Sequence, residues 1–149
     1  MTRNSQFAVA IHILCVLGVL EASGKERVSS RQIAKSVNTN AVVIRNLVVL
    51  LKAARLVESK EGKGGGIRLA KSPAKISLQD IYSAVLGKRG LLGMNRREEF
   101  KQCPVSCGMA QVLPAIFAEV DRAVESSLKG RTLKSVMVAL DSSMEMSET

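Results

Sequence analysis

The chain has few aromatic residues and few cysteines, and each shortage excludes a class of protein. Of its 149 residues, 46% are hydrophobic, yet none is tryptophan, one is tyrosine and three are phenylalanine, so the core must be aliphatic. Three cysteines, an odd number, fit a reducing cytoplasm better than a disulfide scaffold. No apolar run approaches the roughly 20 residues of a membrane span, and no basic and apolar leader is evident. We therefore expect a cytoplasmic protein with no membrane partner.

Catalytic groups are also scarce. The chain has one histidine, His12, and neither a nucleophile motif nor paired carboxylates at a plausible site. Gly62 and Lys63 do not begin a nucleotide P-loop, because three glycines and a strand pattern follow them instead of Ser or Thr and a helix. We therefore do not expect an enzyme.

Positive charge is concentrated in the first part of the chain. The net charge is +9, and residues 1–87 hold 13 Lys and Arg against 5 Asp and Glu. Residues 88–149 are nearly neutral, with 9 against 8. A basic half beside a neutral half indicates a nucleic-acid face and a separate assembly region.

Residues 28–54 show the pattern of two helices joined by a tight turn. The first begins at a capping box, in which Ser29 accepts from an early helical N–H and Gln32 reaches back. After a polar turn, Asn40 caps a second helix whose apolar residues recur at three- and four-residue steps. Helices joined so closely cross steeply, in the helix-turn-helix geometry that presents one helix to a DNA major groove.

A basic, glycine-rich hairpin follows at once. Residues 56–59 and 67–70 alternate apolar and polar side chains, as strands do, and four glycines loosen the segment between them. Lys60, Lys63 and Arg68 lie on or beside its tip, where they can meet a phosphate backbone or enter a minor groove. A helix pair followed by such a hairpin predicts a winged helix-turn-helix domain.

The remaining segments predict further helices around one irregular stretch. They are expected at about residues 4–21, 78–86, 104–129 and 133–140, with Ser77 and Thr132 as caps and Gly130 as a stop. Pro114 should kink or break the third of these helices. Residues 88–102 lack a sustained apolar period and should form a mobile loop.

The long C-terminal helix carries an apolar stripe too wide for one small domain to cover. Pairing with a symmetry-related copy would bury it, and the expected interface residues are Met109, Leu113, Ile116, Phe117, Val120 and Val124. The fold class is thus mainly α with a small β-hairpin wing. We divide the chain into a winged helix-turn-helix DNA-binding domain (1–87), a flexible sensor-like loop (88–103) and dimerisation helices (104–149).

The sequence also resembles a known family. SSRQIAKSV and LLKAARLVESKEGKGGGIRLAKSPAKISLQDIYSAV resemble the Rrf-two family of bacterial winged-helix transcription regulators, which includes IscR, NsrR and CymR. FAVAIHIL, SVNTNAVVIRN and NRREEFKQCPV are most similar to its YwnA-like branch. The resemblance implies a homodimer, held by the long C-terminal helix, that binds a palindromic operator in double-stranded DNA.

The resemblance also implies which residues touch DNA. They are Asn40, Val42, Val43, Arg45 and Asn46 on the recognition helix, and Lys60, Lys63, Gly64 and Gly65 on the wing; Ser29 and Arg68 complete the candidate set. Arg45 suits guanine, Asn46 suits adenine, and valines can pack on thymine methyl groups. We expect a homodimeric, sequence-specific transcription repressor. The alternative is a winged-helix module that binds protein without specific DNA binding.

Cysteines supply the candidate sensor. Cys103 would sit at a helix N-terminus, where the dipole lowers a thiol pKa, and Cys107 would follow one turn later. A disulfide between them would strain the helix, so oxidation could unwind its first turn and change the dimer. His12 and Cys15 lie three residues apart and so share one side of the first helix. They could form a ligand pair or an activated thiol. We favour the alternative, in which they are buried or interface residues.

A cofactor is not expected. Iron–sulfur members of the family use three widely spaced cysteines with a further ligand in the loop before the long helix. Here only Cys103 and Cys107 lie in that region, and Cys15 is far away in sequence. A variant cluster that uses His12 stays open, but we expect neither a cluster nor another metal. A thiol switch is the other candidate, and the alternative to it is that Cys103 and Cys107 are only buried or capping residues.

Overall fold

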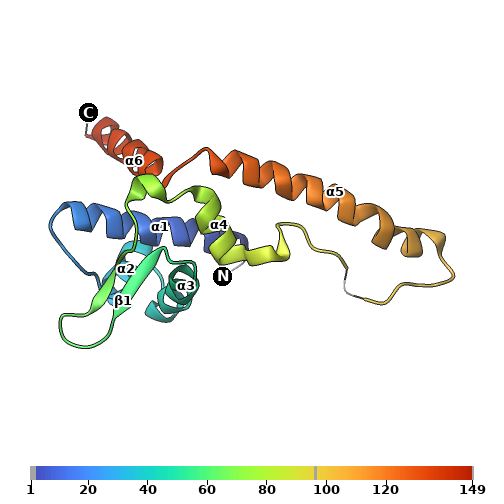
Figure 1. Cartoon of the computed structure of the whole chain (residues 1–149), viewed down its shortest axis with the longest axis horizontal. Coiled ribbons are helices and arrows are strands. Elements are labelled where there is room, and N and C mark those ends of the chain that lie inside the picture. The colour runs from blue at the N-terminus through green and yellow to red at the C-terminus, as the bar shows by residue number, and fades with distance from the viewer. Residues whose placement is uncertain (1–2, 96, 149) are drawn as a thin grey trace.

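The computed structural model describes residues 3–95 and 97–148 (Figure 1). Their elements are α1 (Arg3–Ala22), α2 (Ser30–Val37), α3 (Ala41–Ala53), β1 (Val57–Lys60), β2 (Gly66–Leu69), η1 (Pro73–Lys75), α4 (Leu78–Leu86), η2 (Gly87–Arg89), α5 (Pro104–Lys129) and α6 (Leu133–Ser147). The mainly helical fold with a two-stranded antiparallel sheet confirms the predicted fold class. Four positions lie outside the described residues: 1 and 2 in the predicted DNA-binding domain, 96 in the predicted loop, and 149 in the predicted dimerisation segment.

Polar caps determine where several helices begin. Ser29, Ser77 and Thr132 form capping boxes with Gln32, Asp80 and Ser135. The Oδ1 atom of Asn40 accepts a hydrogen bond from the backbone N–H of Val42 at 2.8 Å. Each such cap is worth about 1 kcal/mol, and these starts agree with the sequence prediction.

α1 is the central helix of the core. It contacts α2, α3, α4, α6 and β2, and its Ile13 and Leu14 have no exposed surface. Leu133, at the start of α6, is also fully buried in this core. α6 therefore packs with the N-terminal elements. The division of the chain into a DNA-binding domain, a loop and dimerisation helices, at residues 87 and 103, remains a prediction about function.

α1 also has the length and composition of a membrane span. Over Ser5–Ala22 its mean hydropathy is 1.8, so the expectation that no apolar run approaches this length is wrong. The same helix supplies Ala10, Ile13 and Leu14 to the core, and a core helix can be as apolar as a span.

Four elements, the two strands, α5 and α6, differ from the sequence prediction. Each strand is displaced by one residue, because the register that pairs Lys60 with Gly66 follows from the turn and not from side-chain alternation. α5 continues through Pro114 without a break. α6 extends past its expected end at Leu140 because no glycine or proline stops it before Ser147.

The segment between η2 and α5 has no helix or strand in the residues described on either side of position 96. It is nevertheless attached to α5 at both ends. The backbone N–H of Leu91 donates to Asp121 Oδ1 at 2.9 Å, and that of Phe100 donates to Ser106 Oγ at 2.9 Å. A change at the start of α5 can therefore move this loop.

Replacing Ile13 with alanine is expected to lower the free energy of unfolding by about 2–5 kcal/mol, because a fully buried side chain leaves a cavity. Val49→Ala is the matched control, since that valine on α3 is 65% exposed, and it should change stability by no more than about 0.5 kcal/mol. Denaturant unfolding measures both variants. Equal losses would contradict the assignment of α1 to the centre of the core.

Candidate nucleic-acid interface

α3 has one buried and one exposed side. Its buried residues are Ile44, Leu47, Val48 and Leu51. Arg45 and Asn46 are exposed, and Val42 and Val49 are exposed by 53% and 65%. These four residues recur at three- and four-residue steps and so share one side of the helix. That side offers hydrogen-bonding groups and methyl groups together, the combination that reads base edges in a major groove.

The structure separates the predicted recognition residues into two groups. Asn40, Arg45 and Asn46 are exposed together with Val42, whereas Val43 is half-buried against the core. The side chains of Ser29 and Asn40 also act as helix caps.

Sequence reasoning missed Val49 on this side of α3. The sequence signal for it is its spacing, because it follows Val42 by seven residues and Arg45 by four. It therefore belongs with the candidate recognition residues.

The hairpin is fixed at its base and open at its tip. Val28 pairs with Ile67 through two backbone hydrogen bonds of 2.9 and 2.8 Å, which attach the hairpin to the start of α2. Gly64 has a φ of +76°, and a Cβ on Gly65 would collide with backbone carbonyl oxygens of the turn. Lys60 and Lys63 are exposed on this tip. In Figure 1 the tip and α3 lie along the same edge of the molecule, across α1 from α5 and α6.

Arg68 is engaged within the hairpin. Its Nη2 atom lies 2.7 Å from Glu58 Oε2, and its Nη1 atom lies 3.6 Å from Glu26 Oε1. The hydrogen bond and charge of Glu58 raise the pKa of the Arg68 guanidinium. Because two carboxylates already surround it, Arg68 is a weaker candidate for a phosphate than Lys60 or Lys63.

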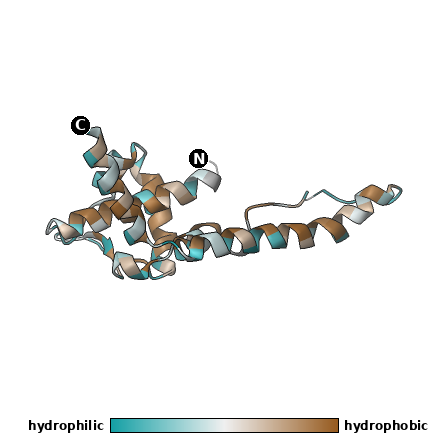
Figure 2. Cartoon of the chain, turned by 90° about the horizontal axis from the view of Figure 1, so that it is seen from above, coloured by the Kyte–Doolittle hydropathy of each residue, from teal (hydrophilic) through white to brown (hydrophobic). Residues whose placement is uncertain are grey.

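α5 has an apolar surface that the rest of the chain leaves uncovered. None of its residues is buried, and Val105, Met109, Val112 and Ile116 are exposed by 63%, 45%, 57% and 49%. Met109 and Ile116 belong to the predicted interface set, and the remaining members of that set, Leu113, Phe117, Val120 and Val124, are half-buried. A groove of about 370 Å³ is lined by Val120, Ala123, Val124, Ser127 and Leu128. Figure 2 shows the hydrophobic colour continuing along this helix.

The candidate sensor residues occupy two separate places. Cys103 caps α5 without a side-chain hydrogen bond, and Cys107 Sγ lies 3.7 Å from the carbonyl oxygen of Lys101. Cys15 is buried in α1, and burial raises the pKa of its thiol. His12 is exposed, with Nε2 3.1 Å from Ser36 Oγ on α2. A raised pKa opposes formation of the reactive thiolate, so the surroundings of Cys15 do not support an activated thiol.

A helix pair followed by a basic hairpin on one edge of a small helical domain defines a winged helix-turn-helix protein. Residues 3–139 match the Rrf2 family (the Rrf-two family named above), described as an iron-dependent transcriptional regulator. The chain belongs to this family of transcriptional regulators. The family consists of regulators, not enzymes, so the prediction against an enzyme is confirmed.

Individual relatives agree with this assignment. YwnA of Bacillus subtilis, which is named as an HTH-type transcriptional regulator, is 41% identical over 134 residues, 90% of this chain and 96% of YwnA. IscR of Cereibacter sphaeroides, a further HTH-type transcriptional regulator, is 34% identical over 85 residues, 57% of this chain and 55% of IscR. The predicted resemblance to the family and to its YwnA-like branch is confirmed.

Solved structures share the fold. The crystal structure of a protein described as DNA-binding has a TM-score of 0.67 and 38% identity, and the match covers 89% of this chain and 98% of that one. CymR, the global cysteine regulator of Bacillus subtilis, has a TM-score of 0.62 at 22% identity, and the match covers 93% of this chain and 95% of the CymR chain.

The family description mentions iron, but the described side chains do not fit an iron site within one protomer. In residues 3–95 and 97–148, no three His, Cys, Asp or Glu side chains come together as a ligand set. Cys15 is buried in α1, whereas Cys103 and Cys107 begin α5, whose start lies far from the body of the molecule in Figure 1. We derive no step that uses iron.

Proposed function

We propose that the protein is a homodimeric, sequence-specific DNA-binding repressor that works in the cytoplasm. The exposed side of α3 carries this proposal, because it places Arg45 and Asn46 between Val42 and Val49, which are 53% and 65% exposed. Buried valines would contribute more stability than exposed ones. Their exposure beside hydrogen-bonding side chains suits a helix that enters a major groove.

Base recognition and backbone contact fall to different residues. Arg45 can donate two hydrogen bonds to guanine O6 and N7, and Asn46 can pair with adenine N6 and N7. Lys60 and Lys63 on the exposed tip supply charge for phosphates or a minor groove. The first pair sets sequence preference, and the second pair adds affinity for any duplex.

Dimerisation through α5 supports the same function. Two copies that pair along the exposed valine, methionine and isoleucine stripe would bury it and present two α3 helices to one duplex. A two-fold protein reads two half-sites related by inversion. The repressor then acts by occupying its operator.

Selection from a pool of random duplexes, followed by affinity measurement against salt, tests the proposal. We expect enrichment of an inverted repeat and a fall in log K of about 0.9 per contacted phosphate for each log unit of salt. A winged-helix module that binds only protein would enrich no sequence and would show no such slope.

The proposed signal is oxidation of Cys103 and Cys107. The backbone N–H of Cys107 donates to the carbonyl oxygen of Cys103 at 3.1 Å, so the two residues lie one helical turn apart. Hydrogen peroxide oxidises one thiol to a sulfenic acid and releases water. The second thiol then attacks that sulfur, forming a disulfide and a second water. Such a bond distorts the first turn of α5 beside Met109.

Peroxide is expected to lower the operator affinity of the wild-type protein about tenfold, a coupling of about 1.4 kcal/mol, and dithiothreitol should restore it. Cys103→Ser should not respond to peroxide, whereas Cys15→Ala, which keeps both switch thiols, should respond as the wild type does. Fluorescence anisotropy with the selected duplex measures each affinity. A Cys103→Ser protein as sensitive as the wild type would remove the thiol switch.

A further inference from the structure

The base of the hairpin carries a cluster of positive charge that neither the recognition helix nor the tip explains. A pocket of about 630 Å³ is lined by Arg27, Lys52, Arg55 and Lys71, with Glu58 as its acidic residue. That carboxylate already pairs with Arg68 at 2.7 Å. Within the part of the chain that the structure describes, none of the four cations forms an ion pair. The pocket therefore gathers four positive charges without a free counter-charge.

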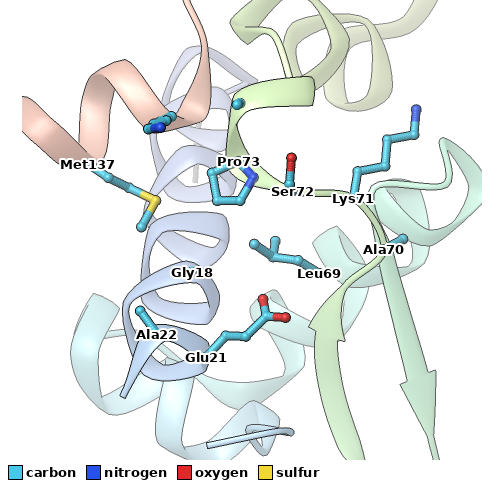
Figure 3. Close-up of a pocket in the computed structure, with 11 residues that line it drawn as sticks. Gly18, Glu21, Ala22, Leu69, Ala70, Lys71, Ser72, Pro73 and Met137 are labelled. Atoms are coloured by element: carbon cyan, nitrogen blue, oxygen red, sulfur yellow. The ribbon is translucent and has the colours of Figure 1, made fainter. Parts of the chain in front are cut away.

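Neutral partners hold two of these cations in place. Lys52 Nζ donates to Ser59 Oγ at 3.0 Å, and Arg27 Nη1 donates to the carbonyl oxygen of Gly66 at 3.4 Å. Lys71 also lines a neighbouring cavity of about 610 Å³, but its side chain extends away from that cavity (Figure 3). Like charges repel at short range, so a bound anion would stabilise this arrangement.

Arg55 has a backbone conformation that disfavours its residue type. Its φ is +60°, at the position after α3 where the N–H of Arg55 donates to the carbonyl oxygen of Lys52 and that of Leu56 donates to Leu51. Glycine usually occupies such a left-handed position, because a Cβ strains it. The arginine instead adds a further positive charge to the pocket.

Helix geometry relates this pocket to the proposed recognition side of α3. Arg45, Val49 and Lys52 are spaced by four and then three residues, so they share one side of the helix. At about 1.5 Å per residue, Lys52 lies roughly 10 Å further along the axis than Arg45. The major groove is about 12 Å wide. When Arg45 reaches base edges, Lys52 therefore comes to the backbone that borders the groove.

We propose that this pocket binds a phosphate group, and that the group belongs to the DNA backbone bordering the groove that α3 reads. The proposal rests on the proposed function and adds Lys52, Arg55, Arg27 and Lys71 to the DNA-binding surface. A free phosphate would meet the same charges, so the experiment separates the two sources.

The test compares Lys52→Gln/Arg55→Gln with Lys129→Gln/Arg131→Gln, which removes the same charge from exposed positions at the end of α5. Affinities for the selected duplex and for a scrambled duplex are measured over a series of potassium chloride concentrations. The pocket variant should lose about 1.8 from the slope of log K against log salt, because each of the two protomers loses one phosphate contact worth about 0.9. It should weaken both duplexes equally, and the control should keep the wild-type slope.

Other results would overturn the proposal in distinguishable ways. A wild-type slope in the pocket variant, while the wild-type protein binds DNA, removes this pocket from the DNA-binding surface and leaves the proposed function standing. If that variant also loses calorimetric binding of sodium phosphate that the wild type shows, the site is for a free anion and the assignment to DNA is wrong. A wild-type protein that binds no duplex overturns both the proposed function and this site's assignment to DNA.

Discussion

Replacing Val112 and Ile116 with glutamate is expected to produce monomers that bind the selected inverted repeat at least about 100-fold more weakly than the wild-type protein. Both side chains are about half exposed in the single chain, at 57% and 49%, so the change should not unfold it. It places two carboxylates in the seam where two copies of α5 would meet. Losing the second half-site then removes an effective concentration worth about 10²–10⁴ in affinity.

A control variant separates interface disruption from added charge. Gln111→Glu/Ala118→Glu adds the same two charges to α5 at exposed positions on the opposite side of the helix. Sedimentation should show the control at twice the 16.0 kDa chain mass and the Val112/Ile116 variant at the chain mass itself. If both variants sediment as dimers, the interface lies elsewhere.

Arg45→Ala is expected to cost about 1–3 kcal/mol of sequence discrimination, roughly 5- to 150-fold, because the bidentate contact to guanine is lost. Lys63→Ala should instead weaken all duplexes similarly and reduce the salt slope by about 1.8, because each of the two protomers loses one phosphate contact worth about 0.9. Anisotropy with the selected duplex, and with one carrying a changed guanine, measures both effects. Equal loss of sequence preference from the two variants would contradict these assignments.

Signals close together in the sequence predicted much of the fold. Ser29, Asn40, Ser77 and Thr132 cap their helices as expected, because a cap depends only on residues within one turn. The start of α5 at Pro104 and its stop at Gly130 follow from equally local rules. Such signals also place α3 and the hairpin next to each other in the chain. These two elements carry most of the candidate site.

Features that depend on contacts across the fold could not be predicted in the same way. The pairing of Arg68 with Glu26 needs the hairpin to fold onto the segment before α2. The half-burial of Val43 depends on how α3 rests on the core. The left-handed backbone of Arg55 runs against its residue type, so propensity argues against it.

Apolar patterning along α5 shows the same limit. Its spacing predicted an interface helix, but Val105 and Val112, which are among the most exposed apolar residues, were left out of the predicted contact set. A periodic stripe says which residues are apolar along one face. It does not say which of those residues are partly covered by the rest of the same chain.

A hydroxyl-radical footprint on the selected duplex tests the central claim most directly. If two copies each place one α3 in a major groove, the footprint will show two equivalent protected segments, related by inversion and centred about 10 base pairs or a multiple of that apart. The Val112/Ile116 glutamate variant should protect neither segment at the same concentration. One unrepeated protected segment, formed equally well by the wild-type protein and that variant, would contradict the account.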